Sequence, residues 1–456
     1  MKVKQLNKEK SKGRNFIYPK KPSGKLYDYR KWVSYVLLLF LFSAPFIKVG
    51  GEQMVLLNFL ERKFVFFGLI FTPQDFYLFA LAMLIILIFI VCFTVVLGRL
   101  FCGWVCPQTI FMEMVFRRIE YWIEGDANQQ RKLDAQPWTR EKILKKGFKH
   151  LIFLFISFLI SNTFLAYLIG SDQLYKIVTE PVSEHVVGFF SIWLFTFIFY
   201  GVFAYVREIV CTVICPYGRL QGVLLDNESL IVAYDETRGE PRGFLQKGVD
   251  NSNKGDCIDC GLCVQVCPTG IDIRKGTQLE CVNCTACIDS CNEVMLKINR
   301  PKDLIGFYSQ NFIKERKPFK IGLRVYGYSA VLFAVILVFS SLIYKRTDVE
   351  TTVLRASGTT FQTRPNGAIS NLYNAELINK TNKDIKFSFT STNPQDQIEF
   401  IQQSTLLPKE GTTRITFFVI KKEKDLTGFK TDVKFEIKAD NKIVSEAKTT
   451  FFSQPK

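Results

Sequence analysis

Long apolar runs and shorter alternating runs divide the chain into two kinds of region. Five runs are nearly free of charge, and they cover residues 32–49, 76–97, 151–169, 186–206 and 325–344. Each approaches the roughly 20 residues that a helix needs to cross a bilayer. One such run alone could be a buried core helix, but five together predict an α-helical membrane bundle of five spans. Pro45 and Lys48 fall in the last turns of the first span, where a kink and a long basic side chain are tolerated.

Two further apolar stretches do not fit a membrane crossing. Residues 53–71 are interrupted by Glu61, Arg62 and Lys63, and each charge would cost about 2.5 to 3.5 kcal/mol at the bilayer centre. We therefore expect an interfacial or re-entrant segment there. A second stretch has helical spacing and is expected to lie along the inner membrane surface; its apolar residues are Ile110, Phe111, Met114, Val115, Ile119 and Trp122.

The last part of the chain, residues 346–456, alternates apolar and polar residues with a period of two. Ile385, Phe387 and Phe389, for example, are separated by single polar residues. This pattern is typical of strands with one buried face. It predicts an all-β immunoglobulin-like sandwich without a disulfide. Recognition of a partner and plain stabilisation are both open as its role.

Charge placement predicts the orientation of the spans. The formal net charge is +17, and eleven Lys or Arg lie in residues 1–31 and nine in 110–149, against three in 50–74 and 171–185 together. Positive residues accumulate on the cytoplasmic side. We therefore expect a multi-pass protein of the bacterial inner membrane with a cytoplasmic N-terminus, residues 207–324 in the cytoplasm and the β-domain in the periplasm. The basic charge is then explained by topology and by the lipid bilayer as partner, not by nucleic acid. The first span has no small-residue cleavage site and is expected to stay as an anchor.

The strongest chemical signal is a doubled cysteine run in the predicted cytoplasmic segment. Cys257, Cys260, Cys263 and Cys267 have the spacing x2, x2, x3, and after 13 residues Cys281, Cys284, Cys287 and Cys291 repeat it. This spacing holds two [4Fe-4S] clusters, and the fourth cysteine of each run binds the other cluster. The predicted ligand sets are Cys257, Cys260, Cys263 and Cys291 for one cluster, and Cys281, Cys284, Cys287 and Cys267 for the second. Structural zinc is the alternative, but its cysteine pairs are usually separated by a longer loop. The proline after the fourth cysteine is present as Pro268 and replaced by Asn292 in the second run.

A second cysteine set ends each of the first two predicted helical hairpins. Residues 99–107 and 207–216 each begin with Arg and end with Cys-x-x-x-Cys-Pro, which supplies Cys102, Cys106, Cys211 and Cys215. A proline after the second cysteine predicts that one helix stops and another begins there. Helix N-termini with Arg99 and Arg207 nearby should lower the thiol pKa values. If the hairpins pack side by side, the four sulfurs form one site for Cu(I), zinc or an iron-sulfur group. The alternative is four small apolar residues at helix ends; for the isolated Cys92, packing is the expected role.

Scarce residues exclude other redox chemistry. The chain has only two histidines, His150 and His185, so paired-histidine haem is not expected, and both are interpreted as interfacial polar residues. No Gly-rich nucleotide fingerprint or phosphate loop is present in the sequence. NADH bound on this chain is therefore not the expected donor, and the electron donor stays unknown.

Together these features resemble the CcoG family, also called FixG or RdxA, accessory proteins of cbb-type cytochrome c oxidase. The resemblance rests on residues 102–108 (CGWVCPQ), residues 211–218 (CTVICPYG), the two cluster runs, the spans and the outer β-domain. It implies an oxidoreductase that reduces Cu(II) to Cu(I) during oxidase maturation, with copper held transiently by Cys102, Cys106, Cys211 and Cys215. Copper ion and copper-transport or oxidase assembly proteins are the implied partners, and Met112 and Met114 are candidate soft ligands. A quinol-oxidising subunit feeding a periplasmic reductase and a scaffold with structural clusters are the alternatives.

The expected domain order follows from these assignments. It runs from a basic cytoplasmic N-terminus (1–31) through a membrane domain (32–215) to a ferredoxin-like two-cluster domain (216–320), the fifth span (325–344) and the periplasmic β-domain (346–456).

Overall fold

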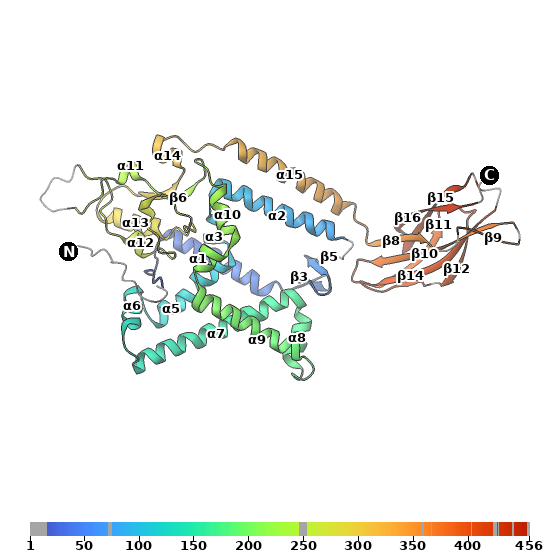
Figure 1. The fold of residues 1–456 in the computed structure, drawn as a ribbon, viewed down its shortest axis with the longest axis horizontal. Helices are drawn as coiled ribbons and strands as arrows, with labels where there is room; N and C mark the ends of the chain where they lie inside the picture. The colour runs from blue at the N-terminus through green and yellow to red at the C-terminus, as the bar shows by residue number, and fades with distance from the viewer. Residues whose placement is uncertain are drawn as a thin grey trace. The chain divides into compact units, whose positions relative to one another are not determined.

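The computed structural model describes residues 16–71, 75–245, 253–356, 360–365, 367–402, 404–422, 426, 428–439 and 442–453 (Figure 1). The first fifteen residues of the predicted basic N-terminus therefore lie outside the described residues. The chain forms two compact units, which are described separately. Unit 1 comprises Met1–Ser43, Met83–Ala166 and Asp172–Val335; unit 2 comprises Ala44–Ala82, Tyr167–Ser171 and Ile336–Lys456.

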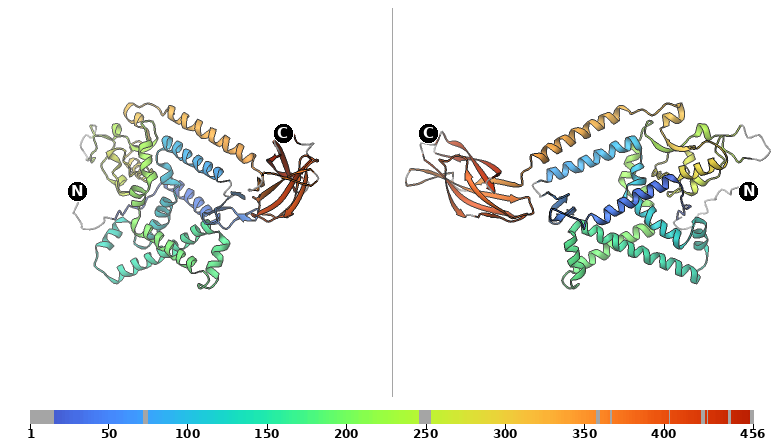
Figure 2. Two further views of the ribbon diagram at one scale, coloured as in Figure 1. Left: turned by 45° about the vertical axis from the view of Figure 1, so that its right-hand side comes forward. Right: turned by 180° about the vertical axis from the view of Figure 1, so that it is seen from behind.

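Four helical segments among the described residues are long and apolar enough to cross a membrane. They are α2 (Phe76–Leu97), α7 (Arg140–Ile169), α9 (Val186–Gly201) continued by η3 (Val202–Val206), and α15 (Leu323–Tyr344). The bounds of α2 agree with the prediction, whereas α7 begins earlier because its Lys-rich first turns are also helical. Helices α7 and α9 cross each other in the ribbon (Figures 1 and 2). The Ser161 hydroxyl of α7 donates to the Ile192 carbonyl of α9 at 3.1 Å.

The predicted first span is wrong in its bounds. Helix α1 covers Lys25–Ser43, and the chain enters β1 (Lys48–Val49) after Pro45. The apolar run therefore does not continue as helix to residue 49, because the proline cannot donate the hydrogen bond that the next turn needs. Helix α1 is not among the four candidate crossings in the described chain, so the fifth span stays a prediction.

The segment expected to be interfacial forms a small antiparallel sheet. Its strands are β3 (Val55–Asn58), β4 (Lys63–Phe66) and β5 (Leu69–Phe71), preceded by β2 (Glu52–Gln53), which pairs with β1. Glu61 and Arg62 occupy the turn between β3 and β4, where Arg62 has φ = 54°. The charged residues therefore lie at a turn and not inside a membrane helix.

The predicted surface helix is helical but it is not a surface element. It comprises α4 (Pro107–Ile110), η2 (Phe111–Phe116) and α5 (Arg117–Ile123), followed by α6 (Ala127–Ala135). Phe116 is fully buried and stacks on Phe203 with ring centroids 4.4 Å apart. Met112 and Met114 are also buried, so the expectation that Met114 lies along the inner membrane surface is wrong. Trp122 is the exposed exception.

The predicted two-cluster domain of unit 1 is built on a two-stranded sheet. Strand β6 (Ile231–Tyr234) pairs antiparallel with β7 (Ile305–Tyr308), and both cysteine runs lie between these two strands in the sequence. Around the sheet lie α11 (Glu236–Gly239), α12 (Leu262–Gln265), η5 (Ile273–Lys275), α13 (Ala286–Lys297) and α14 (Gln310–Glu315). Their apolar core includes Ile271, Met295 and Leu304. Short elements α3 (Leu100–Trp104), α8 (Ser171–Thr179), η4 (Val210–Ile214) and α10 (Pro216–Leu224) complete the helices of the described chain.

The C-terminal part of unit 2 is a sandwich of two antiparallel sheets (Figures 1 and 2). One sheet has the order β12-β14-β10-β8 with β9 at the edge of β10: Gln397–Gln402, Thr412–Lys421, Ile369–Asn379, Val349–Arg355 and Gln362–Thr363. The other has the order β13-β11-β15-β16: Leu406–Leu407, Ile385–Ser391, Lys430–Ala439 and Lys442–Phe452. Tyr373, Phe417 and Phe435 meet in the core between the sheets. The alternating residues of the sequence thus form the inner faces, as predicted.

A buried ion cluster fixes this sandwich to the beginning of α2. Asp75 is 1% exposed and accepts from Arg346 Nη2 at 2.9 Å and Lys380 Nζ at 2.6 Å. Removing one partner of a buried charge pair is strongly destabilising. The cluster therefore restrains the sandwich relative to the small sheet of the same unit.

Candidate electron-transfer site

The two cysteine loops of the ferredoxin-like domain repeat the same backbone path. Asp259 and Gly261 in the first loop have φ values of 52° and 68°, and the matching Asn283 and Thr285 in the second have 51° and 65°. Left-handed residues at the same two positions bend each loop around its three cysteines. Helices α12 and α13 begin directly after Gly261 and Thr285. The x2, x2 spacing is therefore built into a local conformation that occurs twice.

The eight cysteines line two neighbouring cavities. Cys257, Cys260, Cys263 and Cys291 line one cavity. Cys267, Cys281, Cys284 and Cys287 line the other, to whose wall Cys263 also contributes. Each cavity thus receives three cysteines of one run and the fourth of the other, and this donor set fits a four-iron cubane. The ligand assignment itself stays a prediction.

Burial raises the pKa of several of these thiols. The pKa of Cys263, Cys281 and Cys291 rises to about 12, and that of Cys284 to about 11. Without a metal these thiols therefore stay protonated at neutral pH. Because thiolates are the ligands, iron binding must release the protons and so couples loading to pH.

We call residues 99–107 the first corner and residues 207–216 the second corner. Cys106 is the N-cap of α4, with φ = −59° and ψ = 123°, and Cys215 is the N-cap of α10, with φ = −69° and ψ = 112°. A proline occupies the first turn of both helices. The predicted junction of two helices at these cysteines is confirmed.

The predicted lowering of the thiol pKa values is wrong for the first cysteine of each corner. Burial raises the pKa of Cys102 to about 11, although Arg99 opposes the shift. Burial likewise raises the pKa of Cys211 to about 12. The helix packing that buries these two thiols is tertiary, so the local sequence did not reveal it.

Residues next to the two corners bring them close together, but the corners do not form a ready mononuclear metal site. Thr109 Oγ1 lies 4.0 Å from Cys211 Sγ, and the Tyr217 hydroxyl lies 2.9 Å from Thr94 Oγ1. Three sulfurs at about 2.3 Å from one metal are at most about 4.6 Å apart. Within the described part of the chain, the only three metal-ligating side chains with donor atoms inside 4.8 Å of one another are Glu180, Glu184 and His185. The four corner cysteines are thus neighbours whose sulfurs are not gathered.

The first corner packs directly on the second cysteine loop. A Cβ added to Gly103 would lie 2.5 Å from the Val282 carbonyl oxygen and 2.8 Å from that of Asn283. On the other side, Arg30 Nε donates to the Gly103 carbonyl at 2.7 Å. Only glycine allows this approach of backbone to backbone. Cys102 and the loop of Cys281–Cys287 are therefore held as one packed region.

A small polar group closes the first corner. Gln221 Oε1 accepts from Arg99 Nε at 2.8 Å and from Cys102 Sγ at 3.2 Å. Arg99 also donates to the Leu279 carbonyl, which lies two residues before Cys281. Gln221 is fully buried, and sequence reasoning missed it because an isolated Gln on a short helix carries no pattern.

The second corner reaches the same loop system through a small cavity. Cys211 lines this cavity together with Met112 and with Pro268 and Thr269, which follow Cys267. Thr269 Oγ1 lies 3.4 Å from Cys267 Sγ. Of the two candidate soft ligands, Met112 therefore lies beside Cys211, whereas Met114 does not line this cavity. The second corner and a predicted cluster ligand are thus separated by one small cavity.

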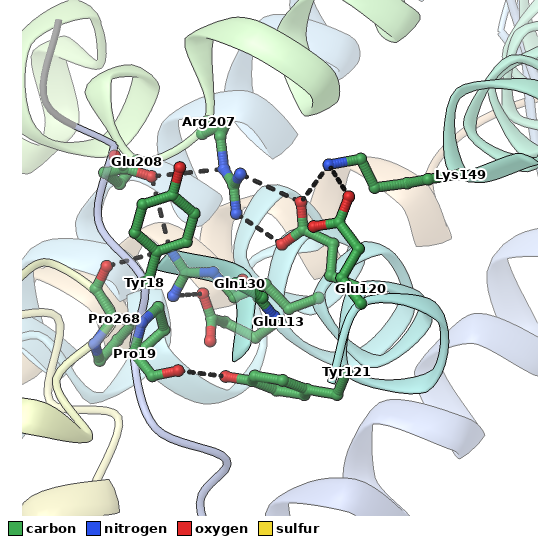
Figure 3. A network of polar contacts seen from close by, with 12 residues as sticks. Tyr18, Pro19, Glu113, Glu120, Tyr121, Gln130, Lys149, Arg207, Glu208 and Pro268 are labelled. Atoms are coloured by element: carbon green, nitrogen blue, oxygen red, sulfur yellow. Dashed lines mark hydrogen bonds and ion pairs between the residues drawn. The ribbon is translucent and has the colours of Figure 1, made fainter. Parts of the chain in front are cut away.

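Buried ion pairs hold the second corner in place (Figure 3). Arg207 donates to both carboxylate oxygens of Glu120, at 3.1 and 2.8 Å, and Lys149 lies on the other side of Glu120. Burial alone would raise the pKa of Glu120, but Arg207, Lys149 and Arg117 hold it below its ordinary value. In the sequence Glu120 interrupts the apolar residues Ile119, Tyr121 and Trp122 of α5, and a carboxylate at such a position is the signal that could have identified it.

The ion-pair network of the second corner extends to the cysteine loops. Arg117 pairs with Glu113 at 2.8 Å and with Glu208 at 3.4 Å, and its Nη2 donates to the Pro268 carbonyl at 3.1 Å. Arg117 is 1% exposed. A buried arginine thus joins the second corner to the residue that follows Cys267.

Cys92 and the two histidines are not part of either corner. Cys92 is in the middle of α2. His185 is the N-cap residue of α9 and contacts Glu180, whereas the Nδ1 of His150 lies 3.0 Å from the Tyr200 hydroxyl.

Comparisons with known proteins agree with this architecture. Residues 206–310 match a 4Fe-4S dicluster domain, residues 79–126 a 4Fe-4S binding domain, and residues 339–454 the Ig-like fold at the C-terminus of FixG. The chain is 34% identical to protein RdxA of Cereibacter sphaeroides over 394 residues, which is 81% of each chain. It is 33% identical to RdxB of the same organism over 82% of each chain.

The chain belongs to the FixG/RdxA family. The nitrogen fixation protein FixG of Rhizobium meliloti is 37% identical over 307 residues, which is 64% of this chain and 57% of FixG. The predicted resemblance is therefore confirmed. Family membership, the 4Fe-4S domains and the four apolar helices together identify a membrane protein of iron-sulfur electron transfer.

Proposed function

We propose that this FixG/RdxA-family protein reduces Cu(II) to Cu(I) at its two corners during maturation of a cbb-type cytochrome c oxidase. The proposal includes five spans in the bacterial inner membrane, a cytoplasmic N-terminus and a periplasmic β-domain. Copper-transport or oxidase assembly proteins are the proposed partners, and Cys102, Cys106, Cys211 and Cys215 are the proposed copper ligands.

The observation that carries the proposal is the position of the corners against the cysteine loops. Gly103 contacts the backbone of Val282 and Asn283, and Cys211 shares a small cavity with Pro268 and Thr269. Two [4Fe-4S] clusters held by the eight ferredoxin-type cysteines would supply single electrons, and Cu(II) needs one electron to become Cu(I).

The residues of the corners suit transient binding of copper. Thiolate sulfur favours Cu(I) over Cu(II), so cysteine ligands stabilise the reduced product. The sulfurs of Cys102 and Cys211 have their own neighbours, Gln221 and Thr109. Copper must displace these contacts and gather the sulfurs, which lowers its affinity and permits its release to a partner.

A cysteine-variant series tests the proposal. Cluster-loaded protein reduced with dithionite and freed of excess reductant is mixed with Cu(II), and Cu(I) is measured with a Cu(I)-specific chromogenic chelator. We expect wild type and the Cys92→Ala control to reduce copper, and the variant with all four corner cysteines changed to alanine to lose at least nine-tenths of the rate. The Cys92→Ala control and the four-alanine variant should both keep the iron content of wild type. Copper reduction by the four-alanine variant at the wild-type rate would exclude the corners as the site.

A further inference from the structure

A large cavity lies at the cytoplasmic end of helices α7 and α9 in unit 1. Its volume is about 660 Å³, which is in the range of small-molecule sites. Its walls come from the beginning of α7, the end of η3 and the segment around Tyr18. The lining residues include Trp138, Ile143, Lys149, His150, Tyr205 and Arg207. His150 stands where the basic first turns of α7 give way to the uncharged run that begins at Leu151. The cavity therefore lies near the level of the lipid headgroups.

The exposed part of the cavity wall, which we call its mouth, is formed by aromatic and aliphatic side chains. Trp138, Ile143 and Tyr205 line it and are 76%, 54% and 51% exposed. Ile143 and Tyr205 belong to helices that are candidate membrane crossings. Trp and Tyr are typical of the membrane-water interface. A ligand that reaches the cavity from the bilayer must therefore be amphipathic.

The charges inside the cavity are already paired. Lys146 pairs with Glu124 at 3.0 Å and with Asp134 at 2.6 Å, and Lys149 pairs with Glu124 at 2.9 Å. Arg207 is held by Glu120 through two hydrogen bonds. Lys142 Nζ donates to the carbonyls of Asp134 and Gln136 at 2.9 and 2.7 Å. An anionic headgroup would have to compete with these partners, so a neutral ring with polar substituents fits better.

His150 gives the cavity a hydrogen-bond partner for such a ring. Its Nδ1 is 3.0 Å from the Tyr200 hydroxyl, and its ring stacks on Tyr205 with centroids 6.1 Å apart. The rings of Tyr200 and Tyr205 also pack edge to face, with centroids 5.9 Å apart. Among the contacts of the described residues, Nε2 of His150 has no hydrogen-bond partner. When Nδ1 carries the proton, Nε2 is an acceptor suited to a phenolic hydroxyl.

Arg207 connects this cavity to the cluster loops. It lines both the large cavity and the small cavity of Cys211 and Pro268. Its Nε lies 3.8 Å from Glu208, whose carboxylate also faces Arg117, and Arg117 donates to the Pro268 carbonyl (Figure 3). The wall of the large cavity is therefore continuous with the residues that contact the loop of Cys267.

We propose that the large cavity binds a membrane quinol and is the electron entry site of this protein. A quinol gives two electrons and two protons when it becomes a quinone. The two predicted clusters, held by the eight ferredoxin-type cysteines, would each accept one electron. Nε2 of His150 would take one proton, and water at the mouth would take the other. The inference rests on the proposed function, because it names the donor for the electrons that reduce copper.

Direct binding tests the site without relying on activity. Menadione and decylubiquinone are titrated by calorimetry into full-length, cluster-loaded protein in detergent. We expect saturable binding by wild type and at least tenfold weaker binding by Ile143→Trp, which fills the mouth, and by His150→Leu. Leu144→Trp is the matched control, because Leu144 is 72% exposed on the same helix and does not line the cavity. It should bind like wild type.

Two outcomes would overturn the quinol site. One is the absence of quinone binding by wild type, or equal binding by Ile143→Trp and Leu144→Trp. The other is that phosphatidylglycerol nanodiscs, compared with phosphatidylcholine nanodiscs, exclude both quinones from wild type, which would assign the cavity to an anionic lipid headgroup.

A reductant that bypasses the cavity separates this inference from the proposed function. Dithionite-reduced Ile143→Trp should reduce copper at the wild-type rate, whereas menadiol should reduce its clusters at least tenfold more slowly than those of wild type. If dithionite-reduced wild type failed to reduce copper but still bound quinones, the copper function would be wrong and the quinol site would stand.

Discussion

The ferredoxin-type loops and the two corners hold cysteines in contrasting ways. In the loops, paired left-handed residues such as Gly261 and Thr285 bend the backbone, so that four cysteines line each cavity. In the corners, Cys106 and Cys215 are set by helix starts, while Cys102 and Cys211 contact Gln221 and Thr109. The loops thus line cavities that fit resident cubanes, whereas the corner sulfurs must move before three of them can bind one metal ion. On the proposed function, this difference would separate electron storage in the loops from the exchange of copper at the corners.

The largest difference between the loops and the corners should appear in the iron content of single-cysteine variants. We expect Cys284→Ala to lose about half of the iron, because one predicted cubane loses a ligand. Cys106→Ala should keep all of it, because the proposed function gives the corner transient copper and no resident iron. Iron and labile sulfide per chain, together with the electron paramagnetic resonance spectrum of the reduced protein, measure the outcome. Equal iron loss in both variants would mean that the corners hold a resident cluster too.

The ion pairs behind the second corner should matter for stability but not for the clusters. Glu120→Gln leaves Arg207 and Lys149 buried without their carboxylate, which should cost about 3 to 5 kcal/mol. Thermal unfolding in detergent measures the loss. Glu141→Gln is the control, since Glu141 is 64% exposed and forms a surface pair with Lys145, and it should change stability by less than about 0.5 kcal/mol. If Glu120→Gln lost iron as well as stability, the second corner would also support the clusters, and the contrast between corners and loops would fail.

The sequence predicted what depends on local pattern and missed what depends on tertiary contact. Cysteine spacing, apolar runs and the alternating tail are local, so the ferredoxin-type domain, four helices and the sandwich were anticipated. The end of α1 at Ser43 was missed because the apolar run continues through Pro45. The contact of Gly103 with Val282, and that of Glu120 with Arg207, join distant segments. The raised thiol pKa of Cys211 follows from the same packing and could not be read locally.

The contact between the first corner and the second loop can be tested by adding one methyl group. In Gly103→Ala the new Cβ would meet two backbone carbonyl oxygens that cannot rotate away. We expect a loss of about 1 to 3 kcal/mol and slower copper reduction by clusters that dithionite has already reduced. Stopped-flow absorbance of the clusters follows the rate. Gly201→Ala, at a helical position with nothing within 4 Å, should instead be neutral or stabilise by up to about 1 kcal/mol. An unchanged rate in Gly103→Ala would mean that this contact does not set the distance for electron transfer.

The smallest expected effects test whether backbone conformation organises the loops. Gly261 and Thr285 occupy the same left-handed position, but only Thr285 carries a β-branched side chain there. A left-handed conformation costs a non-glycine residue about 1 to 2 kcal/mol. Gly261→Ala, with open space around the added carbon, should therefore destabilise the cluster-loaded domain by about 1 kcal/mol. Thr285→Gly should stabilise the domain by less than that. The relief of the left-handed conformation is partly offset, because glycine has more freedom in the unfolded chain and the bond from the Thr285 hydroxyl to the Cys284 carbonyl is lost. Chemical unfolding measures the change in the free energy of unfolding for both variants. If the two changes had the same sign, side-chain contacts, and not backbone conformation, would hold the cysteines of the loops.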